Sequence, residues 1–248
     1  MKITLITATY NSYPNILDTL DSIQQQTHPD IEWVVIDGGS TDLTRSVIKS
    51  TPLISQSISE PDQGIYDALN KGIQRTTGNV IGFVHSDDLL ASPKILETIA
   101  QVFEKTTADG VYGNLVYVDK QDTNKIIRYW KSKPFRRRNL TYGWMPAHPT
   151  LFLKKEVYKK HGLFDLDFKI AADYDFMLRI LKDPGLKFEY LPQVITKMRI
   201  GGASNKSLNN ILQKSQEDLR AMRKNGLSFP VWSLACKNLS KLPQFLKR

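Results

Sequence analysis

Cysteine is nearly absent from this sequence, since Cys236 is the only one in 248 residues. A single cysteine excludes an internal disulfide and a thiolate metal cage, and it favours a reducing compartment. We expect Cys236 itself to be a small hydrophobic side chain, buried or half-buried in the fold.

Long apolar runs are missing as well. No window approaches the roughly 18 consecutive apolar residues that a transmembrane helix needs. The N-terminal stretch "MKITLITATYNS" turns polar after too few apolar residues for a signal peptide. The sequence also has no internal repeat and no low-complexity segment. These absences predict a cytoplasmic protein.

Acidic residues are fewer than basic ones, 25 against 34, which gives a formal net charge of +9. The basic excess suggests an anionic partner and leaves nucleic acid, a phospholipid surface and a phosphorylated small molecule open. Hydrophobic residues make up 41% and charged residues 24% of the chain, as in ordinary globular proteins. Its length suits one large α/β domain or two small ones.

The first hundred residues alternate between strand and helix patterns. Strands are predicted at 3–9, 32–37 and 79–84, the last a near-continuous apolar run typical of a central parallel strand. Apolar residues at helical spacing predict helices on Ile16, Leu20 and Ile23, on Leu43 and Val47, and on Ile65, Leu69 and Ile73.

Two helix starts carry capping signals. Ser40 or Thr41 is expected to cap the helix that contains Leu43, and Ser92 is expected to cap a helix whose first residue is Pro93. The alternation as a whole predicts a doubly wound, mostly parallel sheet with helices on both faces.

The second half has a more mixed pattern. A hairpin is predicted from 110–119 and 125–130, a strand at 149–153, helices at 156–162 and 171–185, and an extended segment at 186–200. A last helix at about 206–225 would carry Leu208, Ile211, Leu212, Ser215 and Leu219 on one face.

Polar residues follow three of the predicted strands. Tyr10 and Asn11 follow the first, Asp37 ends the second, and Asp87 and Asp88 follow the strand at 79–84. Ligands of open α/β sheets bind beyond the carboxyl ends of the strands. Adjacent carboxylates repel, so one would take up a proton unless a cation such as Mg²⁺ or Mn²⁺ lay beside them. Alternatively, the pair consists of turn and cap residues.

Five motifs in order decide between these readings. They are "TATYN" (7–11), "VVIDGGSTD" (34–42), "EPDQGIYDALNKG" (60–72), "HSDD" (85–88) and "AADYDFMLR" (171–179). With them, residues 1–205 resemble the family 2 glycosyltransferases, inverting enzymes of the GT-A fold. The resemblance implies one α/β domain with a nucleotide-sugar half (1–110), an acceptor and catalytic half (111–205), and a C-terminal helical extension (206–248).

The resemblance also implies roles for residues that would bind the donor nucleotide. Tyr10 is expected to stack near the base, Thr7 and Asn11 to assist mostly through their backbone, and Asp37 to accept a hydrogen bond from the base. Asp62 resembles a second nucleoside contact, and Lys71 stands where a basic side chain often reaches the phosphates. Gly38 departs from the commoner "DDGSTD" pattern. Tyr10 and Asp37 as turn residues and Lys71 as a solvated lysine remain the alternatives.

Metal and base follow from the same resemblance. Asp88 is expected to bind Mn²⁺ or Mg²⁺, with Asp87 sharing the ion or contacting the ribose, and the ion would stabilise the departing diphosphate. Asp173 would be the general base that takes the proton of the acceptor hydroxyl; otherwise it is a helix cap. Ala172 stands where the family usually has glutamate. We assign Asp175 to an ion pair with Arg179, four residues later.

Three further residues carry weaker expectations. Trp144 and His148 resemble positions that line the acceptor or donor-sugar pocket, and Arg199 would contact the diphosphate from a flexible loop, "RIGGAS" (199–204). The alternatives are a half-buried core tryptophan, a structural histidine and a plain loop.

The basic excess gathers in two places. Exposed basic residues are expected at Lys131, Lys133, Arg136, Arg137 and Arg138, and the tail from 227 to 248 spaces Trp232, Ala235, Leu239, Leu242 and Leu246 near one helical face. Such a tail can lie in an anionic membrane interface, or it packs on the domain with its lysines in solvent.

Together these features predict a metal-dependent inverting glycosyltransferase. The donor would be a nucleotide sugar, with a UDP-sugar favoured, and the sugar a hexose or N-acetylhexosamine. The acceptor would be a saccharide or lipid-linked hydroxyl in bacterial surface polysaccharide synthesis at the inner face of the membrane. A sugar nucleotidyltransferase would need a Gly-rich, Arg-containing loop where "ATYNSYP" stands. A nucleic-acid-binding function would not explain four aspartates at a crevice, because their charges repel phosphate. These are Asp37, Asp87, Asp88 and Asp173. We therefore expect no nucleic-acid partner.

Overall fold

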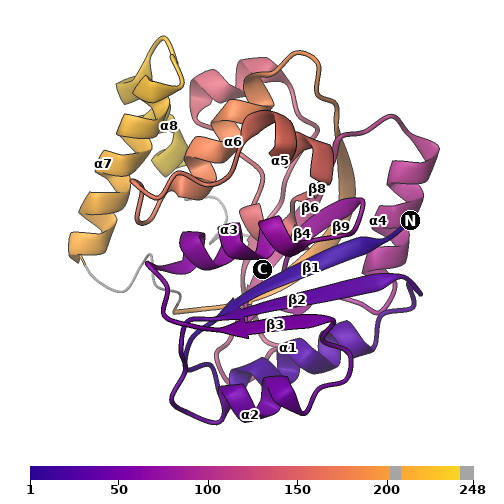
Figure 1. The fold of residues 1–248 in the computed structure, drawn as a ribbon. Coiled ribbons are helices and arrows are strands. Elements are labelled where there is room, and N and C mark those ends of the chain that lie inside the picture. Colours follow the sequence, from indigo (N-terminus) through magenta and orange to yellow (C-terminus); the bar gives the residue numbers. More distant parts are fainter. Residues whose placement is uncertain (202–207, 241–248) are drawn as a thin grey trace.

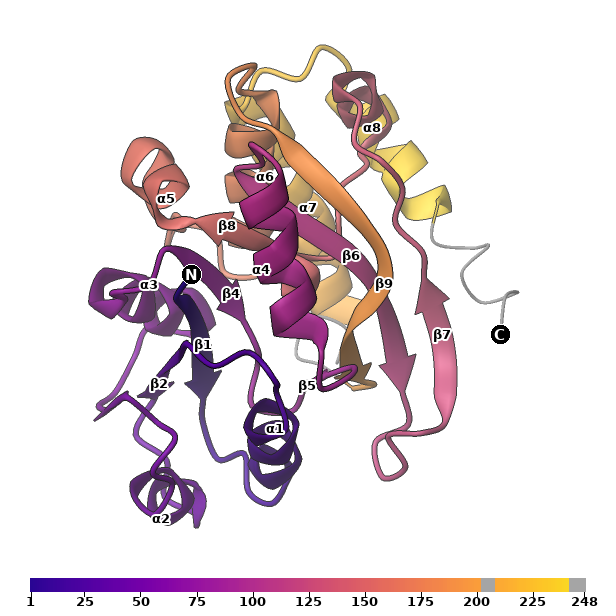
Figure 2. The same cartoon turned by 90° about the vertical axis from the view of Figure 1, so that its right-hand side faces the viewer.

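The computed structural model describes residues 1–201 and 208–240. Nine strands form one sheet in the order β3-β2-β1-β4-β8-β6-β9-β5, with β7 paired to β6 (Figures 1 and 2). Helices cover both faces of this sheet, and two C-terminal helices extend from one side. The predicted α/β architecture with a C-terminal helical extension is confirmed.

The first half of the sheet is parallel. It contains β1 (Ile3–Thr9), β2 (Ile31–Asp37), β3 (Gln56–Ser59) and β4 (Val80–Phe83), connected through α1 (Asn15–Gln24), α2 (Thr44–Lys49) and α3 (Ile65–Arg75). The three strands expected here are present. Strand β3 escaped prediction because "QSIS" is a short edge strand with only one strongly apolar residue.

The second half mixes parallel and antiparallel pairs. It contains β5 (Leu89–Leu90), α4 (Ile95–Lys105), β6 (Gly110–Val118), β7 (Ile126–Trp130), β8 (Phe152–Lys154), α5 (Lys155–His161), α6 (Ala172–Lys182) and β9 (Phe188–Arg199), with 3₁₀ turns η1 (Arg137–Tyr142) and η2 (His148–Thr150). Strand β8 runs antiparallel between β4 and β6 and so joins the two halves. The predicted hairpin is β6 and β7.

Two apolar layers flank the sheet because successive residues of a strand point to opposite faces. Ile3 and Leu5 of β1 pack in the layer of α1 and α4, while Ile6 and Ala8 pack in the layer of α3, α5 and α6. Burial on both faces explains why the central strands read as continuous apolar runs.

Both predicted helix caps are wrong. Helix α2 begins at Thr44, whose N–H donates to the Asp42 carboxylate at 2.9 Å, while Ser40 turns toward Asp37. Helix α4 begins at Ile95 without a side-chain cap, because residues 92–94 form a turn. The carbonyl of Pro93 in that turn accepts a hydrogen bond from the backbone of Thr27, in the segment after α1.

The C-terminal extension consists of α7 (Leu208–Lys224) and α8 (Pro230–Leu239), shown in yellow beside α6 in Figure 1. The apolar face expected on α7 is only partly buried, since Ile211 and Leu212 are exposed. The side chains buried on α7 are instead Glu217, Asp218, Ala221 and Met222. The predicted helix is present, and two acids with partners inside the protein are buried on it.

Helix α8 exposes much of its apolar surface. Val231, Trp232 and Leu239 lie in solvent, as does Phe229 just before the helix. Cys236 is half-buried, as expected. Of the tail positions predicted to share this face, Leu242 and Leu246 lie outside the described residues. No helix in the described part of the chain is long and apolar enough to span a membrane.

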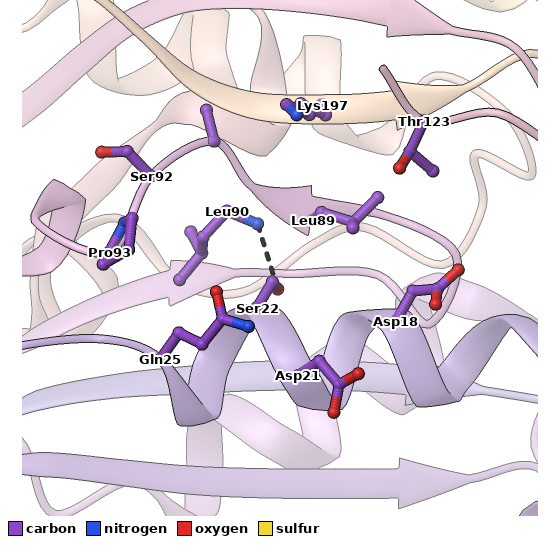
Figure 3. A pocket seen from close by; sticks show the side chains of 11 residues that line it. Asp18, Asp21, Ser22, Gln25, Leu89, Leu90, Ser92, Pro93, Thr123 and Lys197 are labelled. Carbon is purple, nitrogen blue, oxygen red and sulfur yellow. Dashed lines mark hydrogen bonds between the residues drawn. The ribbon is translucent and has the colours of Figure 1, made fainter. Parts of the chain in front are cut away.

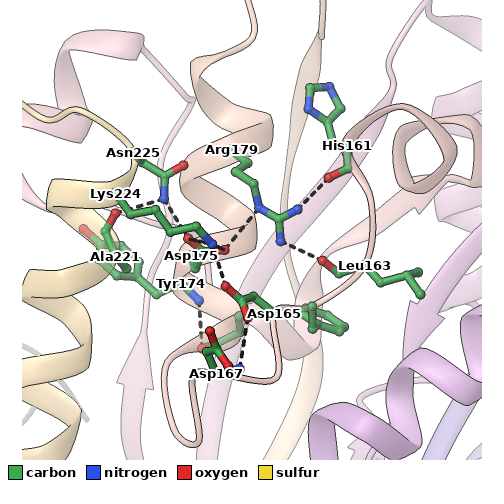
Figure 4. A network of polar contacts seen from close by, with 12 residues as sticks. His161, Leu163, Asp165, Asp167, Tyr174, Asp175, Arg179, Ala221, Lys224 and Asn225 are labelled. Carbon is green, nitrogen blue, oxygen red and sulfur yellow. Dashed lines mark hydrogen bonds and ion pairs between the residues drawn. The ribbon is translucent and has the colours of Figure 1, made fainter.

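Asp175 joins α6 to α7, as Figure 4 shows. Its carboxylate is fully buried and pairs with Arg179 Nε at 3.1 Å, which confirms the predicted ion pair. Lys224 Nζ lies 3.2 Å from the same carboxylate, and Asn225 Nδ2 donates to it at 2.9 Å. A buried charge needs such partners, so Asp175 is a structural residue.

Candidate active site

Three loops meet at the carboxyl edge of the parallel strands. The loop after β1 is tied to the one after β2, because the Asn11 N–H donates to the Ser40 hydroxyl at 2.8 Å. It is tied to the loop after β4 by the Ser12 and Ser86 hydroxyls, 2.7 Å apart. The predicted nucleotide-binding segments therefore form one continuous rim.

Asp37 is buried within this rim, only 1% exposed. Its carboxylate accepts hydrogen bonds from the Ser40 N–H at 3.1 Å, from the Ser59 hydroxyl at 2.5 Å and from the Ser40 hydroxyl. These bonds fix the turn after β2. A carboxylate has about four acceptor positions, so a nucleobase contact would have to use the remaining capacity or displace a serine.

Tyr10, Gly38 and Asp62 lie together beside Asp37. A Cβ atom added at Gly38 would come within 2.5 Å of Asp62 Oδ2 and 3.5 Å of Tyr10 Cδ2. The Asp62 carboxylate thus occupies the space that a side chain at position 38 would fill, and the Gly64 N–H holds it at 2.9 Å. The Tyr10 ring is 62% exposed, with a face open to solvent.

The other residues expected at the nucleotide have partners of their own. The buried Thr7 hydroxyl donates to the Val84 carbonyl at 2.7 Å and accepts from Trp33 Nε1 at 2.9 Å, so its side chain joins strands. Asn11 adopts a left-handed backbone conformation with φ of 47°, and its side-chain oxygen accepts the Thr41 N–H at 2.9 Å.

Lys71 lies on α3 and reaches back to the loop that contains Asp62. Its ammonium lies 2.9 Å from the Glu60 carboxylate and 3.2 Å from that of Asp67. The hydrogen bond to Glu60 and the charge of Asp67 raise the pKa of Lys71. The lysine therefore braces the 60–64 loop, and reaching a phosphate would require it to leave these acids.

Asp88 is the most unusual acid in the rim. It is 1% exposed, and neither carboxylate oxygen has a hydrogen-bond partner among the described residues. Burial, and then the charge of Asp87, raise the pKa of Asp88 well above its ordinary value. A buried acid without partners is costly unless a cation or a proton satisfies it.

The side chains here could bind a divalent cation only together with oxygen atoms of a bound substrate. Within residues 1–201 and 208–240, no three His, Cys, Asp or Glu side chains converge as a complete metal cage. Mg²⁺ and Mn²⁺ are commonly held by one or two carboxylates together with substrate phosphates. Asp88 and Asp87 match that arrangement.

Arg199 lies differently from the predicted position. It is the last residue of β9 and is buried, not part of a flexible loop. Its guanidinium donates to the Asp87 carbonyl at 2.9 Å and the Lys120 carbonyl at 3.2 Å, and it pairs with Asp18. A guanidinium held by these partners supports the backbone of the acid pair. Residues 202–204 of the expected loop lie outside the described residues.

Two histidines connect the acid pair to Asp173. His148 is buried between Phe83 and Phe164, with ring centres 5.1 Å and 5.6 Å away, and its ring centre lies 6.3 Å from that of His85. Burial lowers the pKa of His148 to about 4 and also lowers that of His85, so both rings are neutral at pH 7. The charges of Asp87 and Asp173 both act to raise the pKa of His85 against this burial, so both carboxylates lie in the neighbourhood of its ring.

Asp173 is the second residue of α6, half-buried. Its carboxylate accepts the Tyr66 hydroxyl at 3.1 Å and the Tyr174 N–H at 2.8 Å. The N-cap position is Ala171, without a side-chain cap, so the alternative of Asp173 as cap is not what the helix shows. Tyr66 also lies 2.8 Å from the Ile170 carbonyl, and burial and the Asp173 charge raise its pKa well above the ordinary value.

Sequence reasoning missed His85 and Tyr66 as individual residues. His85 begins the motif "HSDD", and Tyr66 lies in the motif "EPDQGIYDALNKG". The position of His85 after a predicted strand and of Tyr66 at the start of a predicted helix could have indicated that they belong to the site. Trp144 is not among the grouped residues. It stacks on Phe135 at 5.8 Å and packs edge-on to Tyr112 at 5.9 Å, as a half-buried core aromatic does.

A separate cavity of about 200 Å³ lies between α1, β5 and β9 (Figure 3). Asp18, Asp21, Leu89 and Lys197 are among its lining residues, and none of the residues predicted to bind donor or acceptor lines it. Sites for ligands of drug size are larger, about 300 to 1,000 Å³. This cavity is therefore no candidate for a nucleotide-sugar site.

Comparison with known proteins gives consistent matches. The family model described as glycosyl transferase family 2 matches residues 4–162. A PGL/p-HBAD biosynthesis glycosyltransferase of Mycobacterium tuberculosis is 31% identical over 192 residues, which cover 75% of this chain and 72% of that protein.

Solved structures show the same fold at lower identity. TarS residues 1–349 of S. aureus matches with a TM-score of 0.70 at 20% identity, covering 99% of this chain and 71% of that one. The Pyrobaculum calidifontis mannosyltransferase PcManGT, in complex with GDP-Man and Mn²⁺, matches with a TM-score of 0.68 at 21% identity, covering 99% and 73%. The GT-A architecture of these structures is therefore the fold of this chain.

Proposed function

The chain belongs to glycosyltransferase family 2, and on that premise we propose that it moves a sugar from a nucleotide-sugar donor to an acceptor hydroxyl with inversion at the sugar carbon. The observation that carries this proposal is the placement of Asp88 and Asp173. Asp88 is a buried acid whose carboxylate has no hydrogen-bond partner in the described part of the chain, and Asp173 is a half-buried acid whose charge acts on His85, the residue that begins the same loop.

The donor is proposed to be a UDP-sugar that carries a hexose or an N-acetylhexosamine. Two S. aureus TarS structures contain UDP and UDP-GlcNAc, which supports a donor of that kind on this fold. In this chain the nucleoside would lie against Tyr10, Asp62 and the turn of Asp37, where one aromatic face and two carboxylates meet. Lys71 remains the proposed basic group on the phosphate side of the loop.

Mn²⁺ or Mg²⁺ is the proposed cofactor, held by Asp88 and Asp87 with the donor diphosphate. When bound, such an ion supplies Lewis-acid stabilisation of the negative charge on the departing nucleoside diphosphate. The protein contributes a dry pocket for the Asp88 carboxylate and a fixed backbone at Asp87, because Arg199 holds that carbonyl.

Asp173 is proposed to accept the proton of the attacking hydroxyl. Tyr66 suits both protonation states of this acid, since its single hydrogen can point to the Asp173 carboxylate or to the Ile170 carbonyl. Once Asp173 is protonated, it can donate to the Tyr66 oxygen while Tyr66 donates to Ile170. His148 and Trp144 remain proposed acceptor-side residues.

The acceptor is proposed to be a saccharide or lipid-linked hydroxyl used in surface polysaccharide synthesis at the inner face of the membrane. The mycobacterial relative's name, which refers to PGL/p-HBAD biosynthesis, supports a lipid-linked acceptor. Helix α8, which exposes Val231, Trp232 and Leu239, packs against η1, which carries the exposed Arg137 and Arg138. Apolar and basic groups together suit an anionic membrane interface.

A donor screen tests the proposed function. The purified protein is given UDP-, GDP- and dTDP-sugars with Mn²⁺ or with EDTA, and the released nucleoside diphosphate and the anomeric configuration of the product are measured. We expect release from a UDP-sugar, loss of release with EDTA, and an inverted product. A retained configuration, or equal turnover in EDTA, would refute the mechanism.

A further inference from the structure

Glu217 on α7 is a buried acid that the chemistry above does not use. Its carboxylate accepts three backbone N–H groups, those of Lys169 at 3.2 Å, Ile170 at 2.8 Å and Ala171 at 2.9 Å. The Gln213 side chain, one turn earlier on α7, donates to the same carboxylate at 2.9 Å. Four donors on one buried carboxylate fix it firmly, because hydrogen bonds to a charged acceptor are short and strong.

The three backbone groups come immediately before the helix of Asp173. Residues 169–171 lead into α6, and Asp173 is the second residue of that helix. The first N–H groups of a helix lack partners within it, and a negative charge is favourable at that end. Glu217, on α7, therefore fixes the segment that leads into α6, although the two lie 46 residues apart in the sequence at Ala171.

The peptide groups of Ile170 are held from two sides. Glu217 accepts its N–H, and the Tyr66 hydroxyl lies 2.8 Å from its carbonyl oxygen. Tyr66 in turn reaches the Asp173 carboxylate at 3.1 Å. Polar contacts thus run from Glu217 through the backbone of Ile170 to Tyr66, whose single hydrogen bonds either the Ile170 carbonyl or the Asp173 carboxylate.

A second buried polar contact joins the extension to the same place. Lys237 on α8 pairs with Asp218 on α7 at 2.8 Å, and its ammonium lies 3.3 Å from the ring centre of Tyr174, the residue after Asp173. Burial lowers the pKa of Lys237, while the charge of Asp218 acts to raise it. Burying these two charges costs desolvation free energy, which their mutual attraction offsets. The C-terminal helices are therefore attached where the proposed base lies.

We propose that Glu217 is a positioning residue for the transfer reaction. It holds residues 169–171 so that the Asp173 carboxylate stays in line with the acceptor hydroxyl. This inference rests on the proposed function in which Asp173 is the base. It makes the C-terminal extension a part of the active site, because α7 supplies the carboxylate that accepts the N–H groups of residues 169–171.

Kinetics of matched variants test the inference. Glu217→Ala removes all three acceptor contacts, and Glu217→Gln keeps one oxygen for the Ile170 and Ala171 N–H groups. Misplacing a catalytic group by about 1 Å can cost about 100-fold in rate. We expect kcat to fall about 10- to 100-fold in Glu217→Ala with the donor KM within about twofold, and Glu217→Gln to recover part of that loss.

Two controls separate positioning from stability. Met222→Ala loosens the packing of α7 at a buried apolar residue, and Gln216→Ala changes an exposed neighbour of Glu217. We expect Met222→Ala to lower the melting temperature while kcat stays within about twofold of wild type, and Gln216→Ala to match wild type in both. If Met222→Ala and Glu217→Ala lose kcat in proportion to melting temperature, the positioning role is overturned.

Hydrogen–deuterium exchange gives a readout that does not depend on turnover. The backbone amides of residues 169–171 should be protected in the wild-type protein and exchange much faster in Glu217→Ala, while Met222→Ala leaves them protected. Unchanged protection in Glu217→Ala would refute the anchor itself. A wild-type protein that transfers sugar while Asp173→Asn does so equally well would instead refute the proposed base.

Discussion

The buried His148 predicts a specific loss of stability at mildly acid pH. In the folded protein its pKa is about 4, because burial disfavours the charged ring, whereas the ordinary value is 6.5. The unfolded chain therefore binds more protons between these two values, and the free energy of unfolding falls as the pH drops from about 6.5 toward 4. Above about pH 7.5 the group contributes almost no pH dependence, because the ring is then neutral in both states.

The size of this effect follows from the two pKa values. One pKa unit corresponds to about 1.4 kcal/mol, so the His148 contribution lost between pH 7.5 and pH 5.0 is about 2 kcal/mol. Replacing the ring by an apolar side chain removes the titrating group from a pocket formed by Phe83 and Phe164. We expect His148→Leu to show a pH dependence weaker than that of wild type by about 2 kcal/mol.

Denaturant unfolding at pH 7.5 and pH 5.0 measures this difference directly. Phe164→Leu is the matched control, because it changes the same pocket without a titratable group and should lower stability equally at both pH values. The reasoning would be refuted if His148→Leu kept the full wild-type pH dependence. That result would mean that His148 is hydrated or paired in the folded protein.

Two further predictions concern the rim and the base. Gly38→Ala should raise the donor KM about tenfold with little change in kcat, because the new Cβ would lie 2.5 Å from the Asp62 carboxylate and must displace it. In an Asp62→Ala background the same change should have no effect on the donor KM. A full effect in that background would show that the Asp62 carboxylate is not the group displaced. Tyr66→Phe removes the donor to the Asp173 carboxylate and should lower kcat about 10- to 100-fold, since a hydrogen bond to a charged group contributes about 1.5 to 3 kcal/mol. Steady-state kinetics beside Tyr158→Phe, a buried tyrosine of the same core, check this, and equal rates for the two variants would speak against the Tyr66 contact.

Sequence patterns predicted the parallel half of the fold well because both layers of the sheet are apolar. Strands β1, β2 and β4 and the helices between them follow from apolar spacing alone. Edge strand β3 and the order of β8, β6 and β9 could not be predicted, because they depend on which strands pair across long distances and not on local periodicity. The two helix caps failed for a similar reason, since distant segments contact the expected cap residues: the Asn11 N–H donates to the Ser40 hydroxyl, and the Gln26 side chain donates to the Ser92 carbonyl.

The candidate site was predictable as far as residues next to strand ends are concerned. Asp37, Asp87, Asp88 and Tyr10 lie at the rim because the strand termini place them there. Contacts that join distant segments were not predictable, and Arg199 is the clearest case. Its partners are the Asp87 carbonyl, the Lys120 carbonyl and Asp18, and no local pattern links these to the end of β9. Glu217 was missed because a glutamate in a helix reads as a solvated residue.

Calorimetry of UDP binding with and without Mn²⁺ tests the central claim most directly. Asp88 is the proposed residue for donor and metal binding, and Asp173 is the proposed residue for proton removal. We predict that Asp88→Asn loses the increase in UDP affinity that Mn²⁺ causes, while Asp173→Asn keeps it and still fails to transfer sugar. A Mn²⁺-dependent affinity in Asp88→Asn equal to that of the wild-type protein would contradict the account.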